Sequence, residues 1–145
     1  MRLRVIVIEP EQTVRESLAM MVEECGHEAM AFDVPENCPF YRSETCSCPQ
    51  EHACADALLL GQHLPRLRGI TLLERRLNGG CKGAAAHMAL LCLPWSDDDH
   101  SRTAALGCRY LETPLRLGEL ADWLQCIVER TAPGRRLAPR DAPGG

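Results

Sequence analysis

The amino-acid sequence predicts an α/β domain in which a doubly wound, five-stranded parallel sheet lies between two layers of helices. Short runs that are apolar on both faces alternate with longer segments of helical periodicity, which is the pattern of a parallel sheet. Right-handed crossovers then place helices on both faces of that sheet, in an α/β/α arrangement. The chain has 145 residues, 46% of them hydrophobic and 25% charged, which suits one globular domain.

The first half of the pattern is a strand, a helix and a second strand. Residues 5–8, Val-Ile-Val-Ile, form the first strand and are bounded by Glu9 and Pro10. The following helix ends at Gly26, a residue that favours the position after a helix. Its apolar face consists of Val14, Leu18, Met21, Val22 and Cys25. Residues 27–32 are predicted to form the second strand.

Residues 33–55 interrupt every regular period. Three prolines, Pro35, Pro39 and Pro49, stand among four cysteines in this segment. We interpret it as an irregular insert that is organised by a cross-link of its own, because it has few apolar residues to bury.

The second half alternates regularly again. Strands are predicted at residues 56–60, 88–93 and 109–112, and helices at residues 70–77 and from Ser96 to Leu106. The carboxylates after Ser96 favour a helix start, where they face the positive end of the helix dipole. The last helix buries Leu117, Leu120, Ala121, Leu124, Ile127 and Val128. The domain is therefore predicted to span residues 1–130, with a disordered basic tail at 131–145.

The net charge and the number of cysteines limit the classes of function that the protein can have. The net charge of −4 argues against nucleic-acid binding, which needs a clustered basic face. The N-terminal apolar run is too short for a signal peptide or a membrane span, so we expect a cytoplasmic protein without a membrane partner. Nine cysteines in a reducing compartment favour metal binding or redox chemistry over structural disulfides.

Three segments of this chain are similar to response-regulator receiver domains. They are residues 5–11 (Val-Ile-Val-Ile-Glu-Pro-Glu), residues 56–65 with Gly69, and residues 106–114 (Leu-Gly-Cys-Arg-Tyr-Leu-Glu-Thr-Pro). The resemblance runs from about Leu3 to Ile127 and implies the flavodoxin-like receiver fold.

The same resemblance implies that the phosphorylation chemistry of the family is lost. The family holds Mg²⁺ with acids after strand one, phosphorylates an Asp after strand three, and uses a hydroxyl and a Lys nearby. Those positions carry Glu9 and Glu11, Gly61, Cys92 and Thr113. Glycine has no side chain to phosphorylate, so a phosphoryl group is not expected at the usual site. Mg²⁺ is not expected either; Glu9 and Glu11 form at most a weak cation site, and two solvated carboxylates are the alternative.

Four cysteines, Cys38, Cys46, Cys48 and Cys54, form the candidate metal site. Four thiolates on a short loop can hold zinc or an iron-sulfur cluster, although their spacing is not that of a standard finger or ferredoxin. One or two disulfides, or unlinked thiols, are the alternatives. The cysteine pattern also resembles a receiver-like bacterial subgroup of uncharacterised function. Cys81, beside Lys82, is a separate candidate for a reactive thiol.

Two functions follow from these patterns. The first is a stand-alone pseudo-receiver that binds a partner protein, such as a histidine kinase or another signalling protein, with homodimerisation left open. Trp95, Tyr110 and Trp123 are its candidate interface residues, although Trp123 can equally cover the edge of the core. The second is a metal- or redox-responsive sensor that uses the cysteine loop. An enzyme is not expected, because the sequence has no Gly-rich phosphate loop and no nucleophile elbow.

Overall fold

The fold is a parallel five-stranded sheet in the order β2-β1-β3-β4-β5. The structure is a computed structural model that describes residues 1–39, 52–81, 83–92 and 97–139. The strands are β1 (Arg4–Ile8), β2 (Glu28–Phe32), β3 (Ala57–Gly61), β4 (Met88–Cys92) and β5 (Arg109–Glu112). Each predicted strand is therefore confirmed to within one residue at each end.

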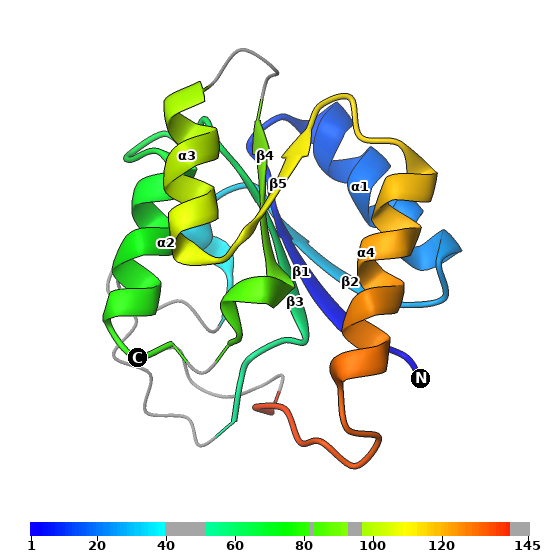
Figure 1. The fold of residues 1–145 in the computed structure, drawn as a ribbon. Helices are drawn as coiled ribbons and strands as arrows, with labels where there is room; N and C mark the ends of the chain where they lie inside the picture. Colours follow the sequence, from blue (N-terminus) through cyan, green and yellow to red (C-terminus); the bar gives the residue numbers. More distant parts are fainter. Residues whose placement is uncertain (40–51, 82, 93–96, 140–145) are drawn as a thin grey trace.

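Two pairs of helices cover the two faces of the sheet (Figure 1). Helices α1 (Gln12–Glu24) and α4 (Leu117–Arg130) pack together on one face. Helices α2 (Gly69–Asn78) and α3 (Asp97–Leu106) pack together on the other. The doubly wound three-layer prediction is confirmed, and Gly26 ends α1 as expected with a φ of 87°.

Side chains that alternate along the strands pack into two separate hydrophobic cores, one on each face of the sheet. Val5 and Val7 of β1 face the α1/α4 layer, whereas Ile6 and Ile8 face the α2/α3 layer. Because the central strands are covered on both sides, β3 is buried along its whole length. Burying each such leucine or isoleucine contributes about 1.5 to 3 kcal/mol.

The cysteine-bearing segment is the connection between β2 and β3. Its described parts lie at the two ends of the connection: residues 33–39 follow the carboxyl end of β2, and residues 52–56 lead into the amino end of β3. Its described parts, residues 33–39 and 52–56, contain one 3₁₀ turn, η1 (Pro35–Asn37). The segment predicted as an irregular insert thus stands where a βαβ unit has its crossover helix.

Residues 131–139 lie against the amino end of the sheet. The Arg135 guanidinium is paired with the buried carboxylate of Asp56, with an Nη2–Oδ2 distance of 2.6 Å. The backbone N–H of Ala138 donates to the carbonyl of Ala53 at 2.9 Å, and Ala138 is buried. The sequence predicts a disordered tail from residue 131; it gave no sign of these contacts, because they join residues far apart in the chain.

Candidate functional site

The positions that correspond to the receiver phosphorylation site gather at the carboxyl end of the sheet. Glu9 follows β1, Gly61 ends β3, and Thr113 follows β5. Strands β1 and β3 are neighbours, with Ile8 paired to Leu60, so Glu9 and Gly61 lie side by side. Cys92 ends β4 at the same edge. The sequence therefore placed these four positions at one end of the molecule correctly.

The carboxylate of Glu9 occupies the space that a side chain at position 61 would need. A Cβ atom added to Gly61 would lie 2.2 Å from Oε2 of Glu9, far inside van der Waals contact. Glycine leaves room for this position of the carboxylate, which a larger residue would displace.

The surroundings of Glu9 favour its neutral form. Burial raises the pKa of Glu9 above its ordinary value, and the charge of Glu11 raises it further. Opposing these effects, the backbone N–H of Glu11 donates to Oε1 of Glu9 at 3.2 Å, and the charges of His63 and Arg15 lower the pKa. The result is a carboxyl group that is protonated more readily than an exposed one.

The donors at this end do not fit the Mg²⁺ site of a receiver. Position 61 supplies no carboxylate, and one oxygen of Glu9 already accepts the Glu11 N–H. Within residues 1–39, 52–81, 83–92 and 97–139, no three His, Cys, Asp or Glu side chains are grouped so that they could hold a metal ion. Glu11 is exposed, so the weak cation site inferred from Glu9 and Glu11 stays a prediction.

The turn after β3 is held tightly. The side-chain oxygen of Gln62 accepts the backbone N–H of Ile70 at 3.0 Å, and the carbonyl of Gln62 accepts the N–H of Gly69 at 2.9 Å. A Cβ atom on Gly69 would lie 2.5 Å from the carbonyl oxygen of Gly61, so only glycine allows this close approach. The Leu-Pro-x-x-x-Gly motif therefore has a structural reason.

The face formed by α3, β5 and the start of α4 contains the candidate binding surface. The rings of His100 and Tyr110 stack with their centroids 4.4 Å apart and an angle of 16° between their planes. A groove of about 450 Å³ runs beside them, between Arg109 and Glu119. Tyr110 lies where the sequence predicted an interface residue, whereas its partner His100 was not predicted.

Of the two predicted interface tryptophans, the structure describes Trp123. Trp123 is 5% exposed and its indole N–H donates to the carbonyl of Ala86 at 3.3 Å. It therefore contributes to the core, the alternative that the sequence had left open for it. Trp95 lies outside the described residues.

Three cysteines line a cavity on the α2 side of the sheet. Cys38, Cys54 and Cys81 line one cavity of about 30 Å³, together with His87 of the 3₁₀ turn η2 (Ala85–His87). Cys38 is 5% exposed, and Sγ of Cys81 accepts the backbone N–H of Gly83 at 3.5 Å. Cys46 and Cys48, the other two members of the candidate metal site, lie outside the described residues.

Cys81 was not included with the loop cysteines on sequence grounds. It follows α2, more than twenty-five residues beyond Cys54 in the chain, and the α2–β4 connection brings it to the cavity. The Gly-Cys-Lys-Gly run around it signalled a turn but not its neighbours.

Searches against protein-family models and against curated proteins found no match. Solved structures do match. The receiver domain of a Francisella response regulator superposes with a TM-score of 0.68 and 19% identity, over 90% of this chain and 100% of that one. A receiver domain from Methylobacillus flagellatus gives 0.68 and 18%, over 88% and 99%. The receiver domain of a Pseudomonas aeruginosa sensor histidine kinase, which holds a magnesium ion in its active-site cleft, gives 0.68 and 17%, over 89% and 99%.

The fold is therefore that of a response-regulator receiver domain. The sheet order 2-1-3-4-5 agrees with this assignment, which the sequence had predicted. The described helices include none that is both long and apolar enough to cross a membrane.

Proposed function

We propose that this protein is a receiver-like signalling module that is not phosphorylated at the usual position and acts by binding a partner protein. The observation that supports it best is the contact between Glu9 and Gly61. The acceptor position has no side chain, and the carboxylate of Glu9 fills the space where one would stand. A phosphoryl group would also meet this carboxylate instead of a lysine, since position 113 is threonine.

The binding surface in this proposal is the face around His100 and Tyr110. The stacked rings of His100 and Tyr110 line the groove on this face. Aromatic side chains supply much of the binding energy at protein interfaces. A histidine kinase or another signalling protein is the expected partner.

One experiment tests the loss of phosphorylation. Full-length protein is incubated with acetyl phosphate and Mg²⁺, and its intact mass is measured before and after acid treatment. We expect no acid-labile phosphoryl group. Incorporation that Glu9→Gln abolishes would show that Glu9 has taken over as the acceptor, and would overturn the proposal.

A second experiment tests the binding surface. Wild-type protein, Tyr110→Ala and the distant control Arg136→Gln are used as bait for candidate histidine kinases. We expect the wild type and Arg136→Gln to bind equally, and Tyr110→Ala to bind at least about tenfold more weakly, an effect within the range of interface hot spots. Equal binding by all three proteins would contradict the assignment of this face.

A metal- or redox-responsive sensor is the second candidate function. Cys38, Cys54 and Cys81 line one cavity, and soft thiolate ligands suit zinc and iron-sulfur clusters. These three are not grouped closely enough to hold a metal ion among themselves, so a metal site would need thiolates outside the described residues, such as those of Cys46 and Cys48. Elemental analysis and an ultraviolet-visible spectrum of protein purified without oxygen test it. Stoichiometric zinc or iron that is lost in a Cys46→Ser, Cys48→Ser double variant would support the sensor, and metal-free protein would remove its metal form.

A further inference from the structure

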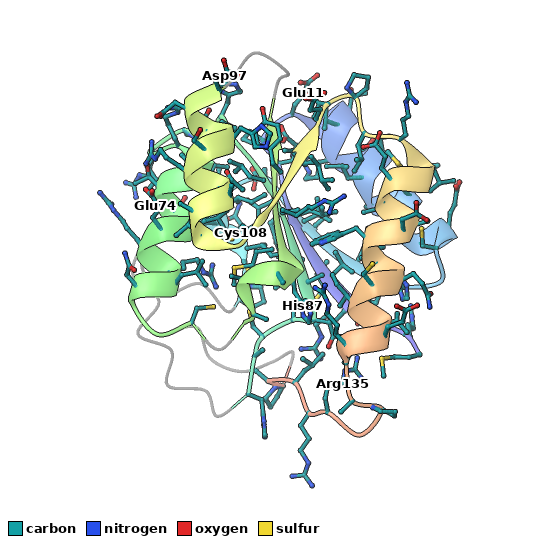
Figure 2. All side chains as sticks on the ribbon, in the orientation of Figure 1. Glu11, Glu74, His87, Asp97, Cys108 and Arg135 are labelled. Atoms are coloured by element: carbon teal, nitrogen blue, oxygen red, sulfur yellow. The ribbon has the colours of Figure 1, made fainter. Side chains whose placement is uncertain are left out.

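The C-terminal segment is fastened to the end of the cysteine-bearing connection. Residues 131–139, here called the C-terminal strap, follow α4 and cross the amino end of the sheet (Figure 1). In Figure 2, Arg135 of the strap lies at the same end of the molecule as His87, and Glu11 and Asp97 lie at the other end. The strap is therefore far from the receiver phosphorylation site.

Arg135 makes the strongest contacts of the strap. Its Nε atom donates to Oδ1 of Asp56 at 2.9 Å and its Nη2 atom to Oδ2 at 2.6 Å, a two-pronged pair. Nη2 also donates to the carbonyl of Arg2 at 3.0 Å. The Asp56 side chain is 3% exposed, so this charge pair is shielded from water on the carboxylate side.

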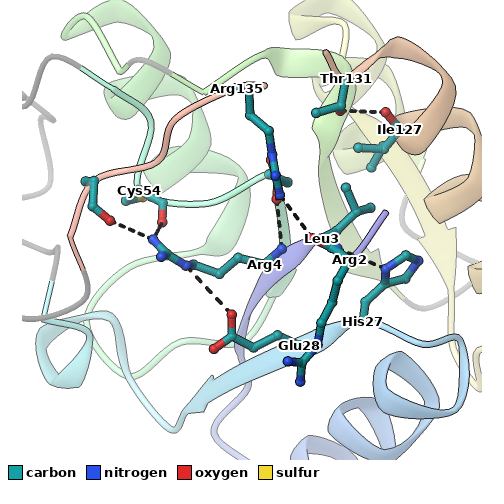
Figure 3. A network of polar contacts seen from close by, with 11 residues as sticks. Arg2, Leu3, Arg4, His27, Glu28, Cys54, Ile127, Thr131 and Arg135 are labelled. Carbon is teal, nitrogen blue, oxygen red and sulfur yellow. Dashed lines mark hydrogen bonds and ion pairs between the residues drawn. The ribbon is translucent and has the colours of Figure 1, made fainter. Parts of the chain in front are cut away.

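Arg4 joins the strap to Cys54 directly (Figure 3). Its Nη1 atom donates both to the carbonyl of Cys54, at 2.9 Å, and to the carbonyl of Ala138, at 2.8 Å. The N–H of Ala138 donates in turn to Ala53. The residues that rejoin β3 are thus held between β1 on one side and the strap on the other.

The same residues form a wall of the thiol-lined cavity. Cys54 and Asp56 both line it, as do Cys81 and the buried Cys38. If the strap detaches, Asp56 loses its charged partner and Ala53 loses its hydrogen bond, so the wall is held only from the β1 side. Local opening of this kind requires far less free energy than global unfolding.

From these contacts we infer that the C-terminal strap controls chemical access to Cys38 and Cys54 in the thiol-lined cavity. With the strap in place Cys38 is buried and Cys54 is half-buried, and with the strap released both react faster with small electrophiles. This inference is independent of the proposed partner binding and of phosphorylation.

The test is site-resolved labelling of the reduced, full-length protein with N-ethylmaleimide. The thiol sulfur bonds to one alkene carbon of the maleimide and the thiol proton ends on the other, so each labelled cysteine gains one maleimide. Rates are measured by mass spectrometry for wild type, Arg135→Gln and the neighbouring exposed Arg136→Gln. Exposed Cys126 reports the intrinsic rate of labelling, and buried Cys108 reports global unfolding.

We expect Cys38 and Cys54 to react about tenfold faster in Arg135→Gln, which corresponds to about 1.4 kcal/mol of local opening. Arg136→Gln should match the wild type, and Cys108 should stay protected in all three proteins. Wild-type rates at Cys38 and Cys54 in Arg135→Gln would overturn the inference.

A general rise that includes Cys108 would mean that Arg135→Gln unfolds the domain. Arg135→Lys then decides, because lysine keeps the charge but cannot make the two-pronged pair. A faster rate confined to Cys38 and Cys54 supports the strap, and wild-type rates in Arg135→Lys overturn it.

Discussion

The two ends of the sheet each place a carboxylate beside a neighbouring strand, but in opposite electrostatic settings. At the carboxyl end, Glu9 is half-buried next to a second acid, and burial raises its pKa. At the amino end, the buried Asp56 accepts the Arg4 N–H at 2.8 Å and both prongs of Arg135. The charged form of Glu9 therefore lowers the stability of the fold at neutral pH, whereas the charged form of Asp56 stabilises it through its hydrogen bonds and ion pair.

The two carboxylates differ in their hydrogen-bond partners. Glu9 accepts the N–H of Glu11, its neighbour in the chain. Asp56 accepts from Arg4 and Arg135, so it joins segments that are far apart in the chain. We therefore expect the two ends to respond differently to mutation and to pH.

The largest effect is expected from Asp56→Ala. The change leaves Arg135 without its carboxylate and the Arg4 N–H without its acceptor, and we expect it to lower the free energy of unfolding by about 2 to 3 kcal/mol. Urea denaturation followed by circular dichroism measures this loss. The matched control is Asp98→Ala, because the Asp98 side chain is 77% exposed and pairs with Arg102 at 3.6 Å. That control should change stability by less than about 0.5 kcal/mol, and similar losses in both variants would contradict the stabilising role of Asp56.

A smaller loss is expected from Gly61→Asp, which restores the acid of the receiver family. The new side chain displaces the Glu9 carboxylate, which is the far end of a flexible, half-buried side chain, so we expect a loss of less than about 1 kcal/mol, mainly from like charge. Removing that carboxylate with Glu9→Ala in the same chain should recover part of the loss. A double-mutant cycle measures the coupling, and strictly additive effects would show that the two positions do not compete for space.

The dependence of stability on pH distinguishes Glu9 from an exposed glutamate. Because the pKa of Glu9 is raised in the folded protein, protonation favours folding. The stability gained in this way is complete below the ordinary carboxyl pKa of 4.5 and is lost as the pH rises through the raised pKa. Glu9→Gln should therefore be more stable than the wild type at pH 7, with a difference that shrinks toward pH 4. Thermal unfolding across this range measures the difference, with the exposed Glu23→Gln as control. A difference that stays constant with pH would refute the assignment.

The smallest change in stability is expected from His27, at the amino end of the sheet. Its dependence on pH is opposite to that of Glu9, because His27 loses stability on acidification. Nδ1 of His27 accepts the Leu3 N–H at 3.0 Å, so this imidazole must be neutral. Burial first, and the N-terminal ammonium next, lower the pKa of His27 below 6.5. The stability it contributes is present above pH 6.5 and is lost as the pH falls through the lowered pKa. His27→Asn keeps an acceptor without a titrating group, so it should lose less stability than the wild type on acidification. If the stability of the wild type and of His27→Asn falls equally as the pH is lowered, the role assigned to His27 is wrong.

Much of the architecture was readable from the sequence because local patterns carry it. The run Val5 to Ile8, the glycine after α1 and the Leu-Pro-x-x-x-Gly turn each encode a local requirement of burial or backbone shape. The resemblance to receivers identified position 61 as the missing acceptor. It did not show that Glu9 fills the space there, because that contact depends on how β1 and β3 are aligned.

The sequence by itself therefore determined the order of the elements, the two apolar faces of the sheet and the glycine at position 61. Only the tertiary structure decided that Cys81 joins Cys38 and Cys54, that His100 stacks on Tyr110, and that Arg135 reaches Asp56. Periodicity is a property of neighbours in the chain, so it predicts helices and strands. Contacts between residues many positions apart are fixed when the packed layers bring their ends together, and a single sequence carries no local signal for them.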